Sequence, residues 1–195
     1  MATIFDQIYK EESYAYGTIP NLYFKEKLDA LSPGKILLPA EGEGRNAVYA
    51  ASQGWDVYCF DNNQYGYYKA LKLAKEKQVD INYELKTAQE IQYDLSSFDV
   101  LALIYTPLEH SDLIKYLKPQ GHLIFENFSK NQIQFHQVNA FSGGPRDASL
   151  LYDYSLMQDA FKTLKAKESY ETEIVLNEGI YHNGLSSVLR FYGVK

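Results

Sequence analysis

Apolar and polar positions along this chain fall into two recurring patterns. Short, nearly continuous apolar runs are bounded by Gly, Pro or polar residues, and they predict buried strands at 35–39, 55–60, 79–85, 98–105 and 122–128. Longer stretches carry apolar residues at helical spacing, and they predict helices at 21–31, 45–53, 65–78 and 108–117. Because strands and helices alternate in order, the pattern predicts βαβ units around a parallel sheet.

The last part of the chain breaks this alternation. Residues 131–147 are polar and rich in turn-forming types, so we expect a loop over the functional site, and 152–165 have the pattern of a final helix. Two further strands, 168–177 and 185–193, are joined by the link 178–184, which permits antiparallel pairing and is too short for a helical crossover. The expected fold class is α/β: a Rossmann-like, doubly wound, mostly parallel seven-stranded sheet with a C-terminal antiparallel β-hairpin and helices on both faces.

Length and composition are those of an ordinary globular domain. The chain has 195 residues, of which 46% are hydrophobic and 23% charged, enough for a substantial core. We expect one domain over 1–195, in which 1–34 form an N-terminal cap segment and helix and 35–195 form the Rossmann-like core.

Charge and cysteine content exclude several classes of partner. The net charge of −6 argues against nucleic acid, because phosphate binding needs a clustered basic surface. No apolar run approaches the ~18 residues of a membrane span and no secretion signal is visible, so we expect a cytoplasmic protein without a membrane partner. The single cysteine, Cys59, has no disulfide partner within the chain and lies in an apolar run, where we expect it to be buried.

The most informative segment is 36–47, an apolar run followed by a glycine turn and the start of a helix. In open α/β sheets, ligands bind beyond the carboxyl ends of the strands, where glycines let a cofactor approach the backbone. Asp61 ends the next predicted strand and is placed to accept hydrogen bonds from ribose hydroxyls. The pattern predicts a nucleoside-cofactor site; the alternative is a plain glycine turn with solvated glutamates.

The charges inside the turn favour one class of cofactor. The spacing Gly42-x-Gly44-x-x-Ala47 also fits the loose dinucleotide pattern of a nucleotide-dependent oxidoreductase. However, Glu41 and Glu43 would repel a pyrophosphate, although Arg45 could offset part of that repulsion. S-adenosylmethionine carries an ammonium and a sulfonium and no phosphate, so acidic residues near the turn suit it.

The ordered set of motifs resembles the class I S-adenosylmethionine-dependent methyltransferases over roughly residues 14–193. The glycine turn corresponds to the family's first motif and Asp61 to its ribose-binding acid, while 117–121 are similar to its Leu-Lys-Pro-Gly-Gly turn. The resemblance implies S-adenosyl-L-methionine as cofactor. The cofactor-binding residues it implies are Tyr16, Gly17, Ala40, Glu41, Gly42, Gly44, Asn46, Asp61, Asn62, Thr87, Ala88 and Tyr105.

A narrower resemblance is to the tellurite-resistance and thiopurine methyltransferase-like group. It rests on Tyr14–Asn21, Gly42–Val48 and Gly143-Gly144-Pro145. This resemblance implies a small-molecule acceptor, such as a thiol, an oxyanion or a similar soft nucleophile. It also implies that the N-terminal segment covers cofactor and substrate. Clustered tyrosines there suit such a lid, although the 18 tyrosines of the chain also fit compositional bias and ordinary packing.

Three positions depart from the family pattern. Leu38 stands where an acid usually meets the methionine ammonium, Ala40 where a glycine is usual, and Thr87 where an acid often meets the adenine amine. Glu41 could replace the missing acid. These departures leave a non-catalytic cofactor-binding module as an alternative.

No catalytic residue is identified from the sequence, because methyl transfer needs a general base only if the acceptor arrives protonated. The substrate-side candidates are Tyr105, Arg146 and His182. A core aromatic is an equal interpretation of Tyr105, while a solvated loop histidine and a surface charge are the favoured interpretations of His182 and Arg146. The other histidines share no metal-ligand spacing, so we expect no metal site and a structural or exposed place for His110, His122 and His136. The sequence indicates no oligomeric state.

Overall fold

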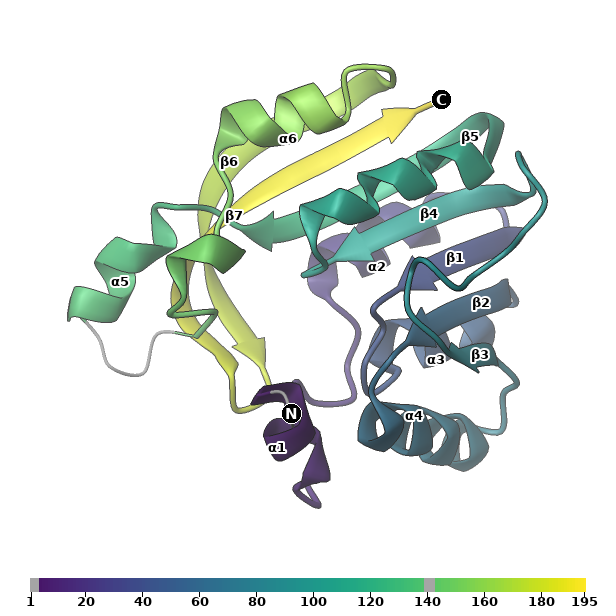
Figure 1. Cartoon of the computed structure of the whole chain (residues 1–195), viewed down its shortest axis with the longest axis horizontal. Coiled ribbons are helices and arrows are strands. Elements are labelled where there is room, and N and C mark those ends of the chain that lie inside the picture. The colour runs from purple at the N-terminus through teal and green to yellow at the C-terminus, as the bar shows by residue number, and fades with distance from the viewer. Residues whose placement is uncertain (1–3, 139–142) are drawn as a thin grey trace.

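The computed structural model describes residues 4–138 and 143–195 (Figure 1). Seven strands form one sheet in the order β3-β2-β1-β4-β5-β7-β6. The first five strands pair in parallel, and β7 pairs antiparallel with both β5 and β6. The predicted fold class is confirmed. The strands are β1 Lys35–Pro39, β2 Asp56–Asp61, β3 Asn82–Leu85, β4 Phe98–Ile104, β5 Leu117–Phe128, β6 Lys165–Glu178 and β7 His182–Val194.

Helices cover both faces of the sheet (Figure 1). One face carries α2, α3 and α4, and the other carries the 3₁₀ helix η1 and α6. This is the doubly wound arrangement that right-handed crossovers produce. The helices are α1 Ile4–Lys10, α2 Leu22–Asp29, α3 Arg45–Ser52, α4 Gln64–Lys77, η1 Leu108–Tyr116, α5 Gln132–Val138, η2 Ala148–Leu150 and α6 Tyr154–Ala160.

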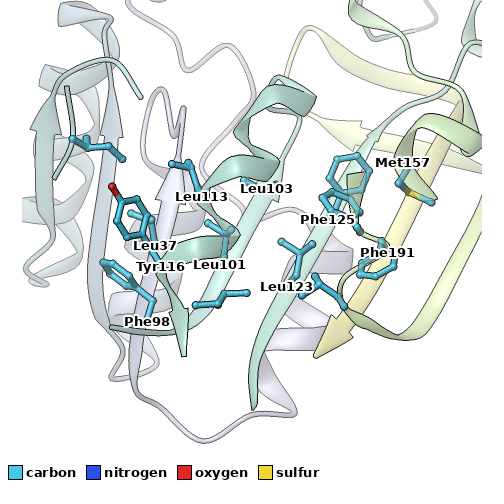
Figure 2. Packing of buried hydrophobic residues seen from close by; sticks show 14 of the residues in the cluster. Leu37, Phe98, Leu101, Leu103, Leu113, Tyr116, Leu123, Phe125, Met157 and Phe191 are labelled. Carbon is cyan, nitrogen blue, oxygen red and sulfur yellow. The ribbon is translucent and has the colours of Figure 1, made fainter. Parts of the chain in front are cut away.

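The core explains why the central strands are continuous apolar runs. Alternate side chains of β4 point to opposite faces, so Leu101 and Leu103 pack under η1 and α6 while Val100 and Ala102 pack under α2 and α3. Figure 2 shows the first of these layers, in which Leu113 and Met157 close over the sheet. Cys59 is buried in the second layer, as expected.

The carboxyl ends of the parallel strands meet at one edge of the sheet, and the chain's distant parts converge there. The hairpin β6–β7 extends past the end of β5, and α1 lies between the tip of this hairpin and α4 (Figure 1). Sequence patterns did not indicate α1. This edge therefore gathers residues from the N-terminus, from the strand ends and from the C-terminal hairpin.

One predicted helix has a different geometry. Residues 108–117 were expected to be α-helical, but Leu108–Tyr116 form a 3₁₀ helix after Pro107. These nine residues must return along β4, whose seven residues span about 23 Å. Nine residues cover about 18 Å as a 3₁₀ helix and only about 14 Å as an α-helix, so the tighter helix suits the connection.

Several further boundaries differ from the sequence prediction. β3 begins at Asn82 instead of 79, and β5 begins at Leu117 instead of 122, so that the predicted turn at 117–121 is part of the strand. The segment 131–147 is not all loop, because α5 occupies its first half; 139–142 lie outside the described residues. Buried Gln132 anchors this helix by bonding the Gly143 carbonyl and the Ser187 N–H, contacts that no local pattern reveals. The helix predicted at 152–165 ends at Ala160. The hairpin strands are longer than predicted, which reduces their link to 179–181. Within the described ranges, no helix is long and apolar enough to cross a membrane.

Candidate cofactor and acceptor site

The glycine turn after β1 has a left-handed backbone at three positions, with φ of 48° at Ala40, 60° at Gly42 and 86° at Gly44. Gly44 must lack a side chain, since a Cβ there would lie 2.5 Å from the Cβ of Ala70 in α4. Ala40 adopts the conformation a glycine would adopt, at a cost of roughly 1–2 kcal/mol. The substitution of the usual glycine by Ala40 therefore leaves the path of the turn intact.

Asp61 ties the turn to the end of β2. Its Oδ2 accepts a hydrogen bond from the Gly42 N–H at 3.0 Å, and its Oδ1 accepts one from the Asn63 N–H at 2.8 Å. Burial raises the pKa of this carboxyl. These two hydrogen bonds hold the partly buried carboxylate rigidly at the end of β2, where the sequence predicted it.

The two glutamates of the turn have different roles. Glu41 is partly buried, and its Oε1 accepts a hydrogen bond from the Ala47 N–H at 2.7 Å, which caps α3. Burial raises the pKa of Glu41 to about 7. Glu43 is 4% exposed and points to the N-terminal segment, where it binds the Ala15 N–H at 2.8 Å and the Lys69 Nζ at 2.7 Å. Of the two acids, only Glu41 therefore has its carboxyl on the turn itself.

Arg45 is bound to the hairpin and to the N-terminal segment. Its guanidinium donates to Glu178 Oε2 at 2.7 Å and to the Tyr16 carbonyl at 3.2 Å, and the residue is buried. This charge is shared between Glu178 and the Tyr16 carbonyl and also acts on Glu41, so little of it is left for a pyrophosphate. The geometry therefore weakens the dinucleotide alternative.

The N-terminal segment lies against both the turn and the hairpin. The Ile180 N–H donates to the Ala15 carbonyl at 2.8 Å, and the Asn21 N–H donates to Asn46 Oδ1 at 2.9 Å. A Cβ on Gly179 would lie 2.5 Å from the Gly17 nitrogen, so the hairpin tip seats directly on the segment. The N-terminal segment therefore lies where a lid over the glycine turn would have to lie.

A tyrosine that the sequence did not single out as a site residue covers the turn itself. Tyr9 of α1 is buried, and its hydroxyl oxygen lies 2.5 Å from where a Cβ on Gly42 would be. The ring of Tyr9 meets that of Tyr16 edge-on, with centroids 6.2 Å apart. Only the absence of a side chain at Gly42 allows a ring or a ligand to approach the turn this closely.

Tyr105 follows β4 directly and lies at the same edge of the sheet. Its φ is 54°, a strained value for an aromatic residue. Such strain persists only where surrounding contacts impose it. The ring stacks on Phe128 at 4.8 Å, and the hydroxyl donates to Glu126 Oε1 at 2.6 Å. Tyr105 is thus fixed in place.

His182 is not the solvated loop histidine that the sequence favoured. It begins β7, pairs directly with Glu178 across the hairpin and is only 8% exposed. Its Nδ1 lies 3.7 Å from Glu178 Oε2 and is buried without a hydrogen-bond partner among the described residues. Burial lowers the pKa of this imidazole. The sequence reading failed because the hairpin strands extend further than the alternation indicated.

The sequence did not predict a buried polar network that adjoins Tyr105 and His182. Glu126 is 0% exposed and accepts hydrogen bonds from Arg190 Nε at 2.6 Å and from Asn21 Nδ2 at 2.6 Å. Asn21 Nδ2 also reaches Glu178 Oε1 at 3.0 Å. The available signal was a charged residue in the middle of each of two apolar runs, 122–128 and 185–193.

The remaining predicted residues are exposed or make contacts outside this network. Thr87 donates from both its N–H and its hydroxyl to Glu90 Oε2, each at 2.8 Å. Asn62 and Arg146 are exposed, the latter as expected, and Ala88 packs against the core. His122 Nδ1 is bonded to the Tyr192 hydroxyl, and the side chain of His136 lies outside the described residues.

Comparison with known proteins decides the family. The model of the family described as tellurite resistance protein TehB matches residues 6–123, from α1 into β5. This chain belongs to the TehB family. The matched region contains the glycine turn and Asp61, two of the features on which the sequence resemblance rests.

Individual relatives agree with this assignment. A ubiquinone biosynthesis O-methyltransferase of Rickettsia akari (strain Hartford) is 30% identical in a 175-residue alignment that covers 80% of this chain and 66% of that protein. The crystal structure of TehB from Haemophilus influenzae has the same fold (TM-score 0.67, 16% identity, 98% of this chain and 65% of that one). So does a SAM-dependent methyltransferase from Aquifex aeolicus (TM-score 0.60, 14% identity, 88% of each chain). The chain spans slightly less than two thirds of the first two relatives.

Membership of the TehB family implies S-adenosylmethionine as the cofactor, and the residues present fit it. The turn offers a fixed carboxylate at Asp61 for hydroxyl groups and a second carboxyl at Glu41 for a cation, while Tyr9 lies over the backbone of Gly42. Leu38, which replaces the usual acid, is buried in the core and takes no part. The carboxyl of Glu41 stays at the turn and remains for that purpose.

Proposed function

We propose that this protein transfers a methyl group from S-adenosylmethionine to a small-molecule acceptor, a thiol, an oxyanion or a similar soft nucleophile. The observation that carries the proposal is the left-handed glycine turn with Asp61 bonded to it at the adjacent strand end. A nucleotide-dependent oxidoreductase is less well supported, because Arg45, the cation that follows the acidic turn in sequence, is already bound to Glu178 and the Tyr16 carbonyl.

The cofactor contacts follow from this arrangement. Asp61 would accept hydrogen bonds from the ribose hydroxyls, and Glu41 would meet the ammonium in place of Leu38. Thr87 and Ala88, which follow β3, would lie on the adenine side. The backbone of Ala40–Gly42 would run along the methionine portion of the cofactor.

When bound, S-adenosylmethionine supplies an electrophilic methyl group on a positively charged sulfur. The chain's own contribution is alignment and exclusion of water. Alignment of the reacting atoms is worth up to ~7–11 kcal/mol of the barrier. The lid around Tyr16 excludes water, and Tyr105 and His182 border the acceptor. Arg45 holds lid and hairpin in one geometry through the Tyr16 carbonyl and Glu178.

Turnover with a defined set of probes tests the proposal. Purified protein is incubated with S-adenosylmethionine and, in turn, thiophenol, catechol, selenite and tellurite, and formation of S-adenosylhomocysteine is measured. We expect product with at least one probe. Tight binding of S-adenosylhomocysteine without turnover of any probe would instead support the non-catalytic binding module that Leu38, Ala40 and Thr87 suggest.

A further inference from the structure

His182 lies at the centre of a ring cluster on the acceptor side. Its ring centroid is 4.4 Å from those of Tyr16 and Tyr105 and 5.1 Å from that of Phe128. These rings come from the N-terminal segment, the end of β4 and the end of β5. Three separate elements thus enclose one imidazole at the edge where the acceptor must meet the methyl group.

The charged groups around His182 are fixed. Glu178 faces it across the hairpin, with Oε2 3.7 Å from Nδ1. The same carboxylate receives Arg45 at 2.7 Å and Asn21 at 3.0 Å, so it cannot move freely. Besides Glu178 and Arg45, the groups that face the imidazole are the phenols of Tyr16 and Tyr105.

The buried nitrogen without a hydrogen-bond partner among the described residues is His182 Nδ1, an arrangement that costs roughly 1–3 kcal/mol, and the acceptor that it faces is Glu178 Oε2 at 3.7 Å. Burial lowers the pKa of His182, and the Glu178 carboxylate only partly opposes this. The imidazole is therefore neutral near pH 7. A neutral imidazole beside a carboxylate, here 3.7 Å away and not hydrogen-bonded to it, has the components of a general base.

We infer that His182 takes the proton of the methyl acceptor, so that the acceptor is a hydroxyl or thiol that arrives protonated rather than an oxyanion. This inference rests on the proposed function, removes the oxyanion from its acceptor class and adds a hydroxyl. Nδ1–H faces Glu178, which leaves Nε2 as the proton acceptor. Glu178 then stabilises the imidazolium.

The step balances without any further reagent. His182 Nε2 receives the proton as the acceptor's O–H or S–H bond breaks. The acceptor's oxygen or sulfur forms its bond to the methyl carbon, and the old carbon–sulfur bond breaks with its electron pair left on sulfur. After the product leaves, the imidazolium returns its proton to water.

The first test observes His182 directly and does not need turnover. In protein labelled with ¹³C-histidine, the His182 resonance is assigned by its loss in His182→Asn and followed against pH. We expect it to titrate below 6.5, the ordinary value for histidine. Adding catechol or thiophenol to protein saturated with S-adenosylhomocysteine should shift this resonance and leave that of His122 unchanged. A His182 resonance that titrates above pH 7, or that neither probe shifts, would overturn the inference.

The second test compares acceptors. His182→Asn should lower turnover of catechol, which is protonated at pH 7, by about 100-fold or more, the usual contribution of a general base. It should also remove the fall of wild-type turnover at low pH. Affinity for S-adenosylhomocysteine should change less than threefold. His122→Asn, which loses only a bond to Tyr192, is the matched control.

The outcomes separate the two proposals. Unchanged catechol turnover and pH profile in His182→Asn would contradict the role of His182 while leaving methyl transfer in place. A wild-type protein that binds no S-adenosylhomocysteine would contradict the proposed function itself. If only selenite or tellurite is methylated, methyl transfer stands and the acceptor class inferred from His182 is wrong.

Discussion

Asp61 and Glu41 each accept a hydrogen bond from a backbone N–H group at or just after the glycine turn. Asp61 receives the Gly42 N–H, and Glu41 receives the Ala47 N–H at the start of α3. Both carboxylates are thus oriented by the backbone before any ligand arrives. Their acidity differs from that of exposed carboxyls because each is partly removed from water.

Replacing Asp61 by Ala should weaken binding of S-adenosylhomocysteine by about ten- to a hundred-fold, because a hydrogen bond to a charged group is worth ~1.5–3 kcal/mol. Isothermal titration calorimetry measures the effect. Asp56→Ala, at the exposed start of the same strand, is the control and should bind normally. Equal affinity in both variants would remove Asp61 from the site.

Glu41 should make stability depend on pH. Its pKa of about 7 in the folded protein exceeds the ordinary 4.5, so the folded state holds this proton more tightly than the unfolded chain does. The free energy of unfolding therefore falls as pH rises from about 4.5 to about 7. Glu41→Gln should gain roughly 1–3 kcal/mol over wild type across this range in urea unfolding. A constant difference between the two proteins would refute the shifted pKa.

The same carboxyl links protonation to the cofactor. If Glu41 meets the ammonium, ligand binding lowers its pKa and releases a proton near pH 7. Calorimetry with S-adenosylhomocysteine in two buffers of different ionisation enthalpy should detect this proton in wild type. Glu41→Gln should release none.

At the scale of elements, the N-terminal segment and the hairpin tip are held together by backbone contacts. Ile180 bonds to the Ala15 carbonyl, and Gly179 leaves no room for a side chain over Gly17. We propose that this contact keeps the lid closed over the turn.

Gly179→Ala should open the lid. Gly54→Ala is a matched control, since both glycines have positive φ (75° and 87°) but only Gly179 is crowded by the lid. Both variants should lose a similar ~1–2 kcal/mol of stability from the backbone. Only Gly179→Ala should increase proteolysis within residues 11–20 and weaken S-adenosylhomocysteine binding. Equal protease sensitivity would mean that Gly179 does not hold the segment.

Most elements were predictable from local patterns, and the exceptions have physical reasons. The strands of the parallel sheet followed from continuous apolar runs, and Asn21 and Asn63 mark the starts of α2 and α4 by accepting their first N–H groups. In contrast, α5 depends on Gln132, whose partners Gly143 and Ser187 are distant in sequence. Short helices held by tertiary contacts carry little local signal.

At the scale of the whole molecule, one part of the site was predictable from the sequence and the other part was not. The turn and Asp61 belong to adjacent segments, so sequence order predicted them. The buried polar network beside Tyr105 and His182 joins four residues from separated segments, so the sequence order does not predict it. These residues are Asn21, Glu126, Glu178 and Arg190. We propose that residues 1–34 act as a cap on the core 35–195 through this network.

The network should also matter for stability. Removing one partner of a buried ion pair leaves the other charge unpaired, which costs roughly 3–5 kcal/mol. Arg190→Gln, which strips Glu126 of its cation, should show this loss in urea unfolding. Lys162→Gln breaks an exposed pair with Asp159 and should cost less than about 1 kcal/mol. Similar losses in the two variants would contradict the burial of Glu126.

Whether the glycine turn and Asp61 form an S-adenosylmethionine site is tested most directly by one calorimetric comparison of ligands. Wild-type protein is titrated with S-adenosylhomocysteine and, separately, with NAD. We predict that S-adenosylhomocysteine binds at one site per chain and that NAD gives no heat of binding at millimolar concentration. Binding of NAD without binding of S-adenosylhomocysteine would contradict the account.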